Sequence, residues 1–188
     1  MSKQRQDFIN KYAKDVILST KNTGLFPSVT MAQFIIESAN SKGESGKGIT
    51  VLKANNAFGI KADKNWKGAK MQFNTPKDGK PISYFRVYPT ILDSLIDRNK
   101  FLKQNKRYTK SGVFDARTPF DQIDAIHRGK YSESPTYNQA LKKIVSAYNL
   151  EKLDGIKIKQ RPNNNGLLFL VLFATTIIIL DNKKALKL

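Results

Sequence analysis

Along most of the chain, apolar residues recur every three to four positions, which places them on one face of an α-helix. Helix starts are marked as well, because Ser28 precedes one apolar stretch and Thr118 with Pro119 precedes another. Serine and threonine at the N-cap position accept hydrogen bonds from free backbone N–H groups, and proline is tolerated in the first turn. We therefore expect Ser28 and Thr118 to be N-caps. The pattern predicts helices over residues 7–18, 29–40, 90–102, 119–128 and 134–148, with a short helix or turn over 51–54.

The pattern changes between residues 65 and 88, where glycine and proline interrupt the helical spacing. Residues 70–73 and 82–87 alternate weakly between apolar and polar side chains on either side of Asp78-Gly79. Asp-Gly is a dipeptide that favours the tight turn of a β-hairpin. The sequence therefore predicts a mainly α domain over residues 1–154 with one small β-hairpin.

The C-terminal part differs in composition from this domain. Residues 155–165 are polar and basic like a linker, residues 166–180 carry no charge, and residues 181–188 are basic again. The uncharged segment is shorter than the ~20 residues of a typical transmembrane helix, but bilayer thinning and snorkelling lysines allow a short helix to span. A buried core helix is the alternative. Because the segment is uniformly apolar and follows a finished domain, we expect a C-terminal transmembrane anchor.

Composition narrows the chemistry that the chain can carry out. Its 188 residues include no cysteine and one histidine, His127. Disulfide scaffolds, thiolate metal sites, cysteine nucleophiles and multi-histidine metal centres are therefore excluded, and a Ser-His-Asp triad would have to use His127. We expect no metal and no organic cofactor, which leaves the carboxylate chemistry that glycosidases use.

The chain carries 33 lysine and arginine residues against 15 aspartate and glutamate residues, a formal net charge of +18. Such a charge attracts polyanions, meaning nucleic acid, anionic lipid or an anionic cell wall, although a solvated lysine-rich surface explains it equally well. No nucleic-acid-binding motif is present, so no specific nucleic-acid partner is expected. The polar N-terminus predicts that there is no secretory signal peptide.

Glu37 is the strongest candidate for an acid catalyst. It lies in the apolar segment MAQFIIES near the end of a predicted helix, and Gln33 lies one turn earlier on the same face. An apolar environment raises the pKa of a carboxyl group, as a general acid requires near neutral pH. The alternative is that Glu37 faces water on the polar side of an amphipathic helix, and periodicity alone favours that alternative.

The other candidates each have an ordinary structural explanation. Asp78 is the only acidic residue in the predicted hairpin and is explained adequately as a turn former. Aromatic rings stack on sugars but more commonly belong to the core. Trp66 lies in the polar loop KNWKG, so we expect it to be exposed and to face a ligand. The aromatic candidates are Phe58, Trp66, Tyr84, Tyr88, Tyr131 and Tyr137.

Five short segments, taken together and in this order, resemble one known family. They are AQFIIES, NNAFGIK followed by W-x-G, FRVYPT before a helix, RYT, and KYSESPTY before the last helix. Over about residues 7–153 the chain resembles the peptidoglycan glucosaminidases of glycoside hydrolase family 73, most closely those of Bacteroidetes-type bacteria and their phages. The resemblance implies a lysozyme-like helical fold with a β-hairpin lobe across the cleft. It also implies hydrolysis of the β-1,4 bond after N-acetylglucosamine in peptidoglycan.

The resemblance also assigns roles to residues. Glu37 matches the family's catalytic acid, and Asp78 is the acid in the hairpin that can serve as second carboxylate, although another alignment places Gln72 there. The sequence departs from the family in the longer segment after Glu37 and in Arg98, which stands where a histidine is expected. The expected substrate-binding residues are Gln33, Phe58, Trp66, Tyr131 and Tyr137.

The expected function is that of a peptidoglycan hydrolase, a phage lysin or virion-associated enzyme located at the virion membrane or the host cell envelope. Its expected partners are the glycan strands of peptidoglycan and, through the C-terminal segment, a membrane. A lytic transglycosylase on the same fold and a non-catalytic wall- or membrane-binding protein are the alternatives. Retaining, inverting and substrate-assisted mechanisms all remain open, because the separation of the carboxylates decides among them.

Overall fold

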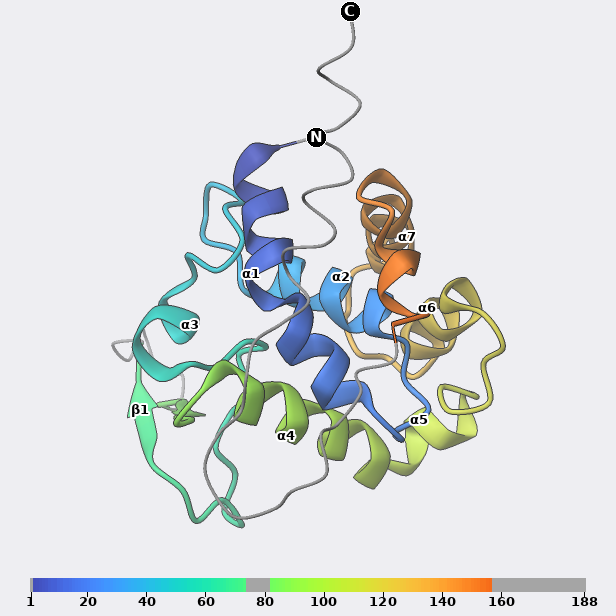
Figure 1. The fold of residues 1–188 in the computed structure, drawn as a ribbon. Helices are drawn as coiled ribbons and strands as arrows, with labels where there is room; N and C mark the ends of the chain where they lie inside the picture. The colour runs from blue at the N-terminus through green and yellow to red at the C-terminus, as the bar shows by residue number, and fades with distance from the viewer. Residues whose placement is uncertain (1, 74–81, 157–188) are drawn as a thin grey trace, which may run out of the picture. The chain divides into compact units, whose positions relative to one another are not determined.

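The computed structural model describes residues 2–73 and 82–156, and within them the chain is mainly helical (Figure 1). Two short strands, β1 (Lys70–Gln72) and β2 (Tyr84–Arg86), accompany the helices in this part of the chain. The helices are α1 (Lys3–Thr20), α2 (Pro27–Glu37), α3 (Ile49–Ala54), α4 (Ile91–Gln104), α5 (Lys106–Lys110), α6 (Pro119–Arg128), α7 (Tyr137–Ala147) and the 3₁₀ helix η1 (Leu150–Leu153).

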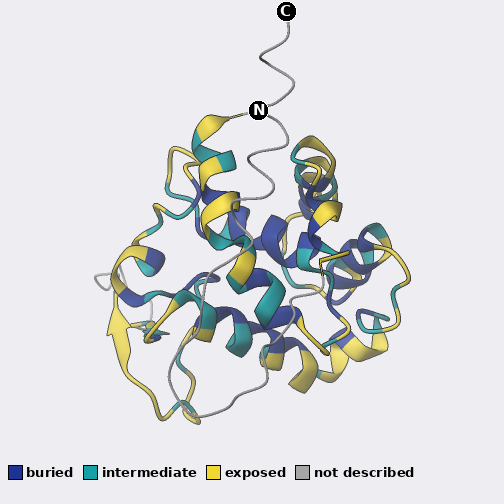
Figure 2. Cartoon of the chain, viewed as in Figure 1, coloured by how far each residue is buried: buried dark blue, intermediate teal, exposed yellow. Residues whose placement is uncertain are grey.

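The core forms around α2, which packs against α1, α6, α7 and η1. Residues 28–35 of this helix are all buried, and Figure 2 shows it largely in dark blue among more exposed helices. No charged residue precedes Glu37 within α2, so its apolar and small polar side chains can be buried on every side. The enclosed helix therefore holds its one charged group, at its end, in a fixed place relative to the core.

The N-terminus of α2 is capped by a residue from the other end of the domain. Asp154, which follows η1, accepts hydrogen bonds from the backbone N–H of Ser28 at 2.8 Å and from its hydroxyl at 2.7 Å. A carboxylate there satisfies free N–H groups and interacts favourably with the helix dipole. The prediction that Ser28 is the N-cap is wrong, because α2 begins at Pro27 and Phe26 occupies the N-cap position.

The other predicted helices are confirmed, with some ends shifted. α6 has the predicted bounds, because Pro119 begins it and the side chain of Thr118 accepts a hydrogen bond from the backbone N–H of Asp121. α1 extends beyond the prediction at both ends, α2 ends three residues early and α7 begins three residues late. The sequence pattern misses α5 and η1, because helices of five and four residues are too short to show a period.

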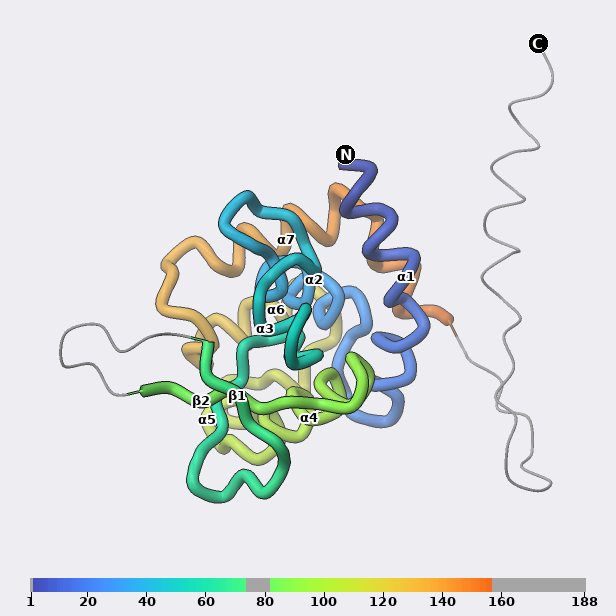
Figure 3. Tube along the Cα trace, turned by 90° about the vertical axis from the view of Figure 1, so that its left-hand side faces the viewer, coloured from blue at the N-terminus to red at the C-terminus, as the bar shows by residue number. Residues whose placement is uncertain are grey.

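The two strands of the predicted hairpin are also confirmed. β1 and β2 pair in antiparallel register, with Lys70 opposite Arg86 and Gln72 opposite Tyr84. Figure 3 shows the strands beside α3, and α3 contacts β2. The predicted turn at Asp78-Gly79 lies outside the described residues.

Within residues 2–73 and 82–156, the structure contains no helix with the length and apolar character needed to cross a membrane. The predicted apolar segment 166–180 and basic tail 181–188 lie outside the described residues, as does the predicted linker from residue 157 onward. The expectation of a C-terminal anchor therefore stays a prediction from sequence.

Candidate active site

Glu37 is the last residue of α2, and the chain that follows closes tightly onto this helix end. The hydroxyl of Ser38 accepts a hydrogen bond from the backbone N–H of Gly46 at 2.9 Å, and its carbonyl accepts one from Gly48 at 2.8 Å. A Cβ atom at Gly48 would lie 2.9 Å from the Ser38 carbonyl oxygen, so this close approach requires glycine. The loop after α2 thereby holds the backbone at Glu37 in place.

The Glu37 carboxyl group is hydrogen-bonded to a tyrosine that is distant in the sequence. The hydroxyl of Tyr137, at the start of α7, donates to Oε1 of Glu37 at 2.7 Å and accepts from Nε2 of Gln33 at 3.0 Å. A tyrosine hydroxyl has one proton to donate, so the bond from Gln33 leaves that proton for the carboxyl group. Gln33 is fully buried, and its Oε1 has no hydrogen-bond partner among the described residues. α2 and α7 together thus build a hydrogen-bonded row that ends on Glu37.

The surroundings raise the pKa of Glu37. Burial has the largest effect and raises the pKa above the usual glutamate range, because the charged form loses its water. The hydrogen bond from Tyr137 and the charge of Arg98 lower the pKa without cancelling the effect of burial. Burial and the Glu37 charge also raise the pKa of Tyr137 far above its ordinary value, so its hydroxyl stays a donor. The alternative of a fully solvated Glu37 is excluded.

Aromatic rings and a buried arginine lie behind Tyr137. The ring of Tyr131 stacks on that of Tyr137, with centroids 6.0 Å apart and planes 17° apart. Arg98, from α4, is fully buried, and its guanidinium lies 6.0 Å from the Tyr131 ring centroid and 5.3 Å from that of Phe58. Phe58 is itself buried and also packs on Phe34, so it supports the site from the core. We name as the Glu37 cluster the residues Gln33, Glu37, Arg98, Tyr131 and Tyr137.

Besides Phe58, which packs behind the cluster, two of the sequence-predicted site residues are not placed in it. The prediction that Trp66 is exposed is wrong, because its half-buried indole donates to the carbonyl of Ala69 at 3.0 Å and packs 4.6 Å from the guanidinium of Arg86. The loop is polar in sequence, but the indole of Trp66 packs against it and is hydrogen-bonded within it. Asp78, the predicted second carboxylate, lies outside the described residues.

Arg86 belongs to a second polar cluster, beside β2. Its guanidinium forms ion pairs with Asp97 at 2.7 Å and with Asp63 at 3.1 Å. The hydroxyl of Tyr88 donates to the same oxygen of Asp97, also at 2.7 Å. These bonds tie β2 to α4. We name as the Asp97 cluster the residues Asp63, Trp66, Arg86, Tyr88 and Asp97.

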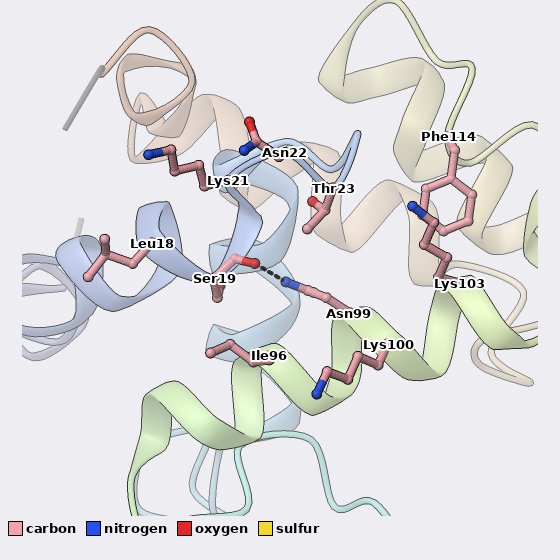
Figure 4. A pocket seen from close by; sticks show the side chains of 10 residues that line it. All are labelled: Leu18, Ser19, Lys21, Asn22, Thr23, Ile96, Asn99, Lys100, Lys103 and Phe114. Atoms are coloured by element: carbon pink, nitrogen blue, oxygen red, sulfur yellow. Dashed lines mark hydrogen bonds between the residues drawn. The ribbon is translucent and has the colours of Figure 1, made fainter. Parts of the chain in front are cut away.

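A hollow of about 320 Å³ lies between the end of α1 and α4 (Figure 4). Lys21, Lys100 and Lys103 line it, together with Asn99, whose amide donates to the carbonyl of Ser19 at 2.8 Å. No carboxylate and no member of the Glu37 cluster lies among its lining residues. The hollow therefore offers no acid and is separate from the candidate active site.

The Glu37 cluster is suited to proton transfer rather than to holding a metal. Among the residues that the structure describes, no three histidine, aspartate or glutamate side chains gather in a way that could hold a metal ion. The polar neighbour of the Glu37 carboxyl is a hydroxyl that donates to it. A protonated carboxyl in this setting can give its proton to an ether oxygen and then keep a hydrogen bond on the resulting carboxylate.

Arg98 is the member of the cluster that sequence reasoning missed as a site residue. In the sequence it stands out only as a departure from the expected histidine, yet the spacing of its neighbours indicates that it is buried. Leu95, Arg98 and Leu102 are spaced by three and four positions, so they share one face of α4, and all three are fully buried. A cation at a core position of an amphipathic helix indicates a specific electrostatic role.

The chain also matches known proteins in sequence. Residues 13–150 match a family model described as mannosyl-glycoprotein endo-beta-N-acetylglucosaminidase. The chain is 30% identical over 169 residues to a probable N-acetylmuramidase of Lactococcus lactis subsp. lactis, covering 85% of this chain and 37% of that protein. It is 30% identical over 144 residues to the peptidoglycan hydrolase FlgJ of Vibrio parahaemolyticus, covering 70% of this chain and 44% of that protein. The chain therefore spans less than half the length of these relatives.

The fold matches solved structures as well. The catalytic domain of the autolysin Auto from Listeria monocytogenes aligns with a TM-score of 0.65 and 29% identity, covering 82% of this chain and 89% of that one. The glycoside hydrolase domain of FlgJ from Salmonella typhimurium aligns with a TM-score of 0.62 and 25% identity, covering 81% and 91%. Nearly the whole of each solved domain is thus present in this fold.

Proposed function

Because the chain belongs to the mannosyl-glycoprotein endo-beta-N-acetylglucosaminidase family, we propose that it is a glycoside hydrolase that cleaves peptidoglycan after N-acetylglucosamine. One observation carries the proposal: Glu37 ends the buried helix α2, accepts a hydrogen bond from Tyr137 at 2.7 Å and has a raised pKa. A glycosidase needs such a carboxyl group to protonate the leaving oxygen. The net charge of +18 supports an anionic polymer such as the cell wall as the substrate.

In the proposed reaction, the proton of Glu37 moves to the glycosidic oxygen as the bond from that oxygen to the anomeric carbon breaks. The pair of electrons from the broken bond stays on the leaving oxygen, and Glu37 becomes a carboxylate. The Tyr137 hydroxyl remains hydrogen-bonded to Glu37 and stabilises that charge. Gln33 keeps the hydroxyl proton directed at the carboxyl group, since its amide occupies the hydroxyl's acceptor side.

The anomeric carbon must then be stabilised and attacked, and a water molecule supplies the hydroxyl group that this carbon carries in the product, while the other proton of that water passes to a carboxylate of the enzyme. Asp78 is the proposed second carboxylate, and the acetamido oxygen of the substrate is the proposed alternative nucleophile. Asp78→Asn tests whether Asp78 takes part: a loss of turnover as large as that of Glu37→Gln supports Asp78 as the second carboxylate, as nucleophile, base or stabiliser of the acetamido group, whereas near-normal turnover contradicts that assignment.

The function is tested with the full chain and purified peptidoglycan. We expect the wild-type protein to release new reducing ends that carry N-acetylglucosamine, and Glu37→Gln to release them at least about 10²-fold more slowly while remaining folded. Mass spectrometry of the products separates the alternatives. Anhydro-muramyl ends without new reducing sugars would indicate a lytic transglycosylase, and binding to intact sacculi without any cleavage would indicate a non-catalytic wall-binding protein.

The proposed location is a membrane-bearing virion or the host cell envelope, where a phage lysin would act. The apolar segment 166–180 and the basic residues after it support this proposal. Fractionation before and after detergent tests it, because an anchored protein stays with membranes until detergent is added. Release of the protein by salt alone would contradict an anchor.

A further inference from the structure

Arg98 is a buried cation without a paired anion in the described part of the chain. Its Nη1 donates to Oδ1 of Asn99 at 2.9 Å and to Oγ1 of Thr30 at 3.4 Å. Its Nε and Nη2 have no well-formed hydrogen bond to the described residues, although the Tyr131 hydroxyl lies close enough to the guanidinium to raise the pKa of Arg98. None of the ion pairs among those residues includes Arg98. A guanidinium taken out of water in this way is unfavourable unless something compensates its charge. Its place in the core therefore requires a physical reason.

Aromatic rings connect this cation to Glu37. Phe58 and Tyr131 present their rings to the guanidinium at 5.3 and 6.0 Å, and the negative face of an aromatic ring attracts a cation. Tyr131 in turn stacks on Tyr137, whose hydroxyl donates to Glu37. A side chain from α4 thereby supports, through two stacked rings, the group that contacts the acid at the end of α2.

Electrostatic interactions join the same residues. The positive charge of Arg98 favours the ionised form of Glu37 and so lowers its pKa against the larger effect of burial. Burial lowers the pKa of Arg98 itself, while Tyr131, Tyr137 and Tyr108 raise it. Within the described residues, these three tyrosines and Glu37 are the titratable groups coupled to the guanidinium, from α2, α5, α7 and the segment before α7. The guanidinium stays protonated, as arginine does in proteins.

We infer that Arg98 is a positioning residue of the proposed hydrolase, which holds Tyr131 against Tyr137 and stabilises the Glu37 carboxylate left after proton transfer to the glycosidic oxygen. This inference rests on the proposed function. Arg98 has no exposed surface, so it cannot touch a glycan. Its effect falls on the chemical step and not on substrate binding.

Two substitutions at this position separate charge from shape. Arg98→Met removes the charge and keeps a long side chain, whereas Arg98→Lys keeps the charge. In Arg98→Met we expect kcat on peptidoglycan to fall by roughly 10- to 100-fold with KM unchanged, because the acid is misplaced and its carboxylate loses a stabilising charge. We also expect the alkaline limb of the pH profile, which follows deprotonation of Glu37, to move to higher pH. Arg98→Lys should leave that limb at its wild-type position.

A role in packing alone predicts a different result. Both substitutions would then lower activity to a similar extent, and neither would move the alkaline limb. That outcome would overturn the inference, as would wild-type kcat in Arg98→Met.

A variant that keeps Arg98 makes the test independent of its packing. Asn99→Asp places a carboxylate where Oδ1 of Asn99 now accepts from Nη1 at 2.9 Å, so it compensates the charge without removing the guanidinium, and it gives up the amide bond to the Ser19 carbonyl. Asn99→Leu, which loses that same bond and adds no charge, is the matched control and should leave the pKa of Glu37 unchanged. Carboxyl ¹³C NMR titration of the full chain, with Glu37→Gln for assignment, measures the pKa of Glu37 without any turnover. A higher pKa of Glu37 in Asn99→Asp supports the inference, and an unchanged pKa overturns it even where Arg98→Met does not fold. Because this titration needs no substrate, a wild-type protein without hydrolase activity contradicts the proposed function and not this coupling.

Discussion

Two polar clusters in this molecule contain the same chemical groups but connect them differently. In the Glu37 cluster and the Asp97 cluster alike, a tyrosine hydroxyl donates to a carboxyl oxygen at 2.7 Å and an arginine lies against an aromatic ring. In the Asp97 cluster, Arg86 also forms an ion pair with the carboxylate at 2.7 Å. In the Glu37 cluster, Arg98 forms no ion pair within the described residues. It lies against the ring of Tyr131, and its charge lowers the pKa of Glu37 without direct contact.

The ion pair that Asp97 forms with Arg86, and that Glu37 does not form with Arg98, distinguishes the two carboxyl groups: Asp97 holds β2 and α4 together as a structural clamp, whereas Glu37 is suited to act as an acid. Burial lowers the pKa of Arg86, but the hydrogen bond and the charge of Asp97 outweigh it and raise the pKa overall, so Arg86 stays positively charged. None of the ion pairs among the described residues includes Glu37, and burial leaves its pKa raised. Asp97 is therefore held by an ion pair and a tyrosine hydrogen bond that tie β2 to α4, whereas Glu37 has a raised pKa, as a group that gives up a proton near neutral pH requires.

The largest expected effect is on activity and falls on one cluster only. Glu37→Gln keeps an acceptor for Tyr137 but has no acidic proton to give, so we expect hydrolysis of peptidoglycan to fall by about 10²- to 10⁴-fold. Asp97→Asn, the matched change in the other cluster, should retain most of the activity. Release of reducing ends per folded molecule measures both, with circular dichroism as the control for folding. Equal losses in the two variants would remove the functional distinction between the clusters.

The next effect is on stability and falls on the other cluster. Asp97→Ala removes an acceptor from Arg86 and from Tyr88 at once, so we expect the free energy of unfolding to fall by about 2 kcal/mol. Glu37→Ala should lower it less at neutral pH, because desolvation makes the ionised form of this partly buried carboxyl group unfavourable. Urea denaturation of both variants measures the difference. An Asp97→Ala protein as stable as the wild type would show that the Asp97 cluster is not a clamp.

A smaller effect follows from removing one hydroxyl from each cluster. Tyr137→Phe deletes the hydrogen bond that lowers the pKa of Glu37, so the alkaline limb of the pH profile should move to higher pH. Loss of this bond to the developing carboxylate should also lower kcat by roughly tenfold. Tyr88→Phe is the matched control and should leave the limb in place. A limb that does not respond to Tyr137→Phe would mean that the hydroxyl has no influence on the acid.

The smallest expected effect is a pH dependence of stability. The folded-state pKa of Glu37 is raised above its unfolded value, so its contribution to stability is complete at low pH and is lost as the pH rises through the folded-state pKa. The free energy of unfolding of the wild type should therefore decrease relative to that of Glu37→Gln as the pH increases. Urea denaturation of both proteins across the acid to neutral range measures this difference, in which the other titrating groups cancel. A constant difference would contradict a raised pKa.

The sequence is sufficient to predict a helix or strand when residues within or next to that element determine its ends. The bounds of α6 follow from Thr118 and Pro119, and the antiparallel pairing of residues 70–72 with 84–86 follows from alternation around a turn dipeptide. The start of α2 did not follow in this way, because its cap is the carboxylate of Asp154, 126 residues away from Ser28. Tertiary contacts of that kind leave no signal in a short window of sequence.

At the candidate site, too, contacts between residues that are distant in sequence cannot be predicted from local patterns. The resemblance to a family selected Glu37, whereas periodicity alone favoured a solvated side chain, because it could not show that α2 is enclosed by four other helices. The bond from Tyr137 depends on the packing of α7 against α2. The sequence of a polar loop does not show that Trp66 is half-buried, because the ring packs on Arg86, a residue 20 positions later.

The central claim is that Glu37 keeps its proton to a higher pH than an ordinary glutamate, and one measurement tests it directly. The chain contains four glutamates, so carboxyl ¹³C signals from a glutamate-labelled full chain are few, and Glu37→Gln assigns the one of interest. We predict that the Glu37 signal titrates above the usual glutamate pKa. A midpoint at or below that value would mean that Glu37 is already ionised where the reaction needs its proton, and would contradict its role as the acid.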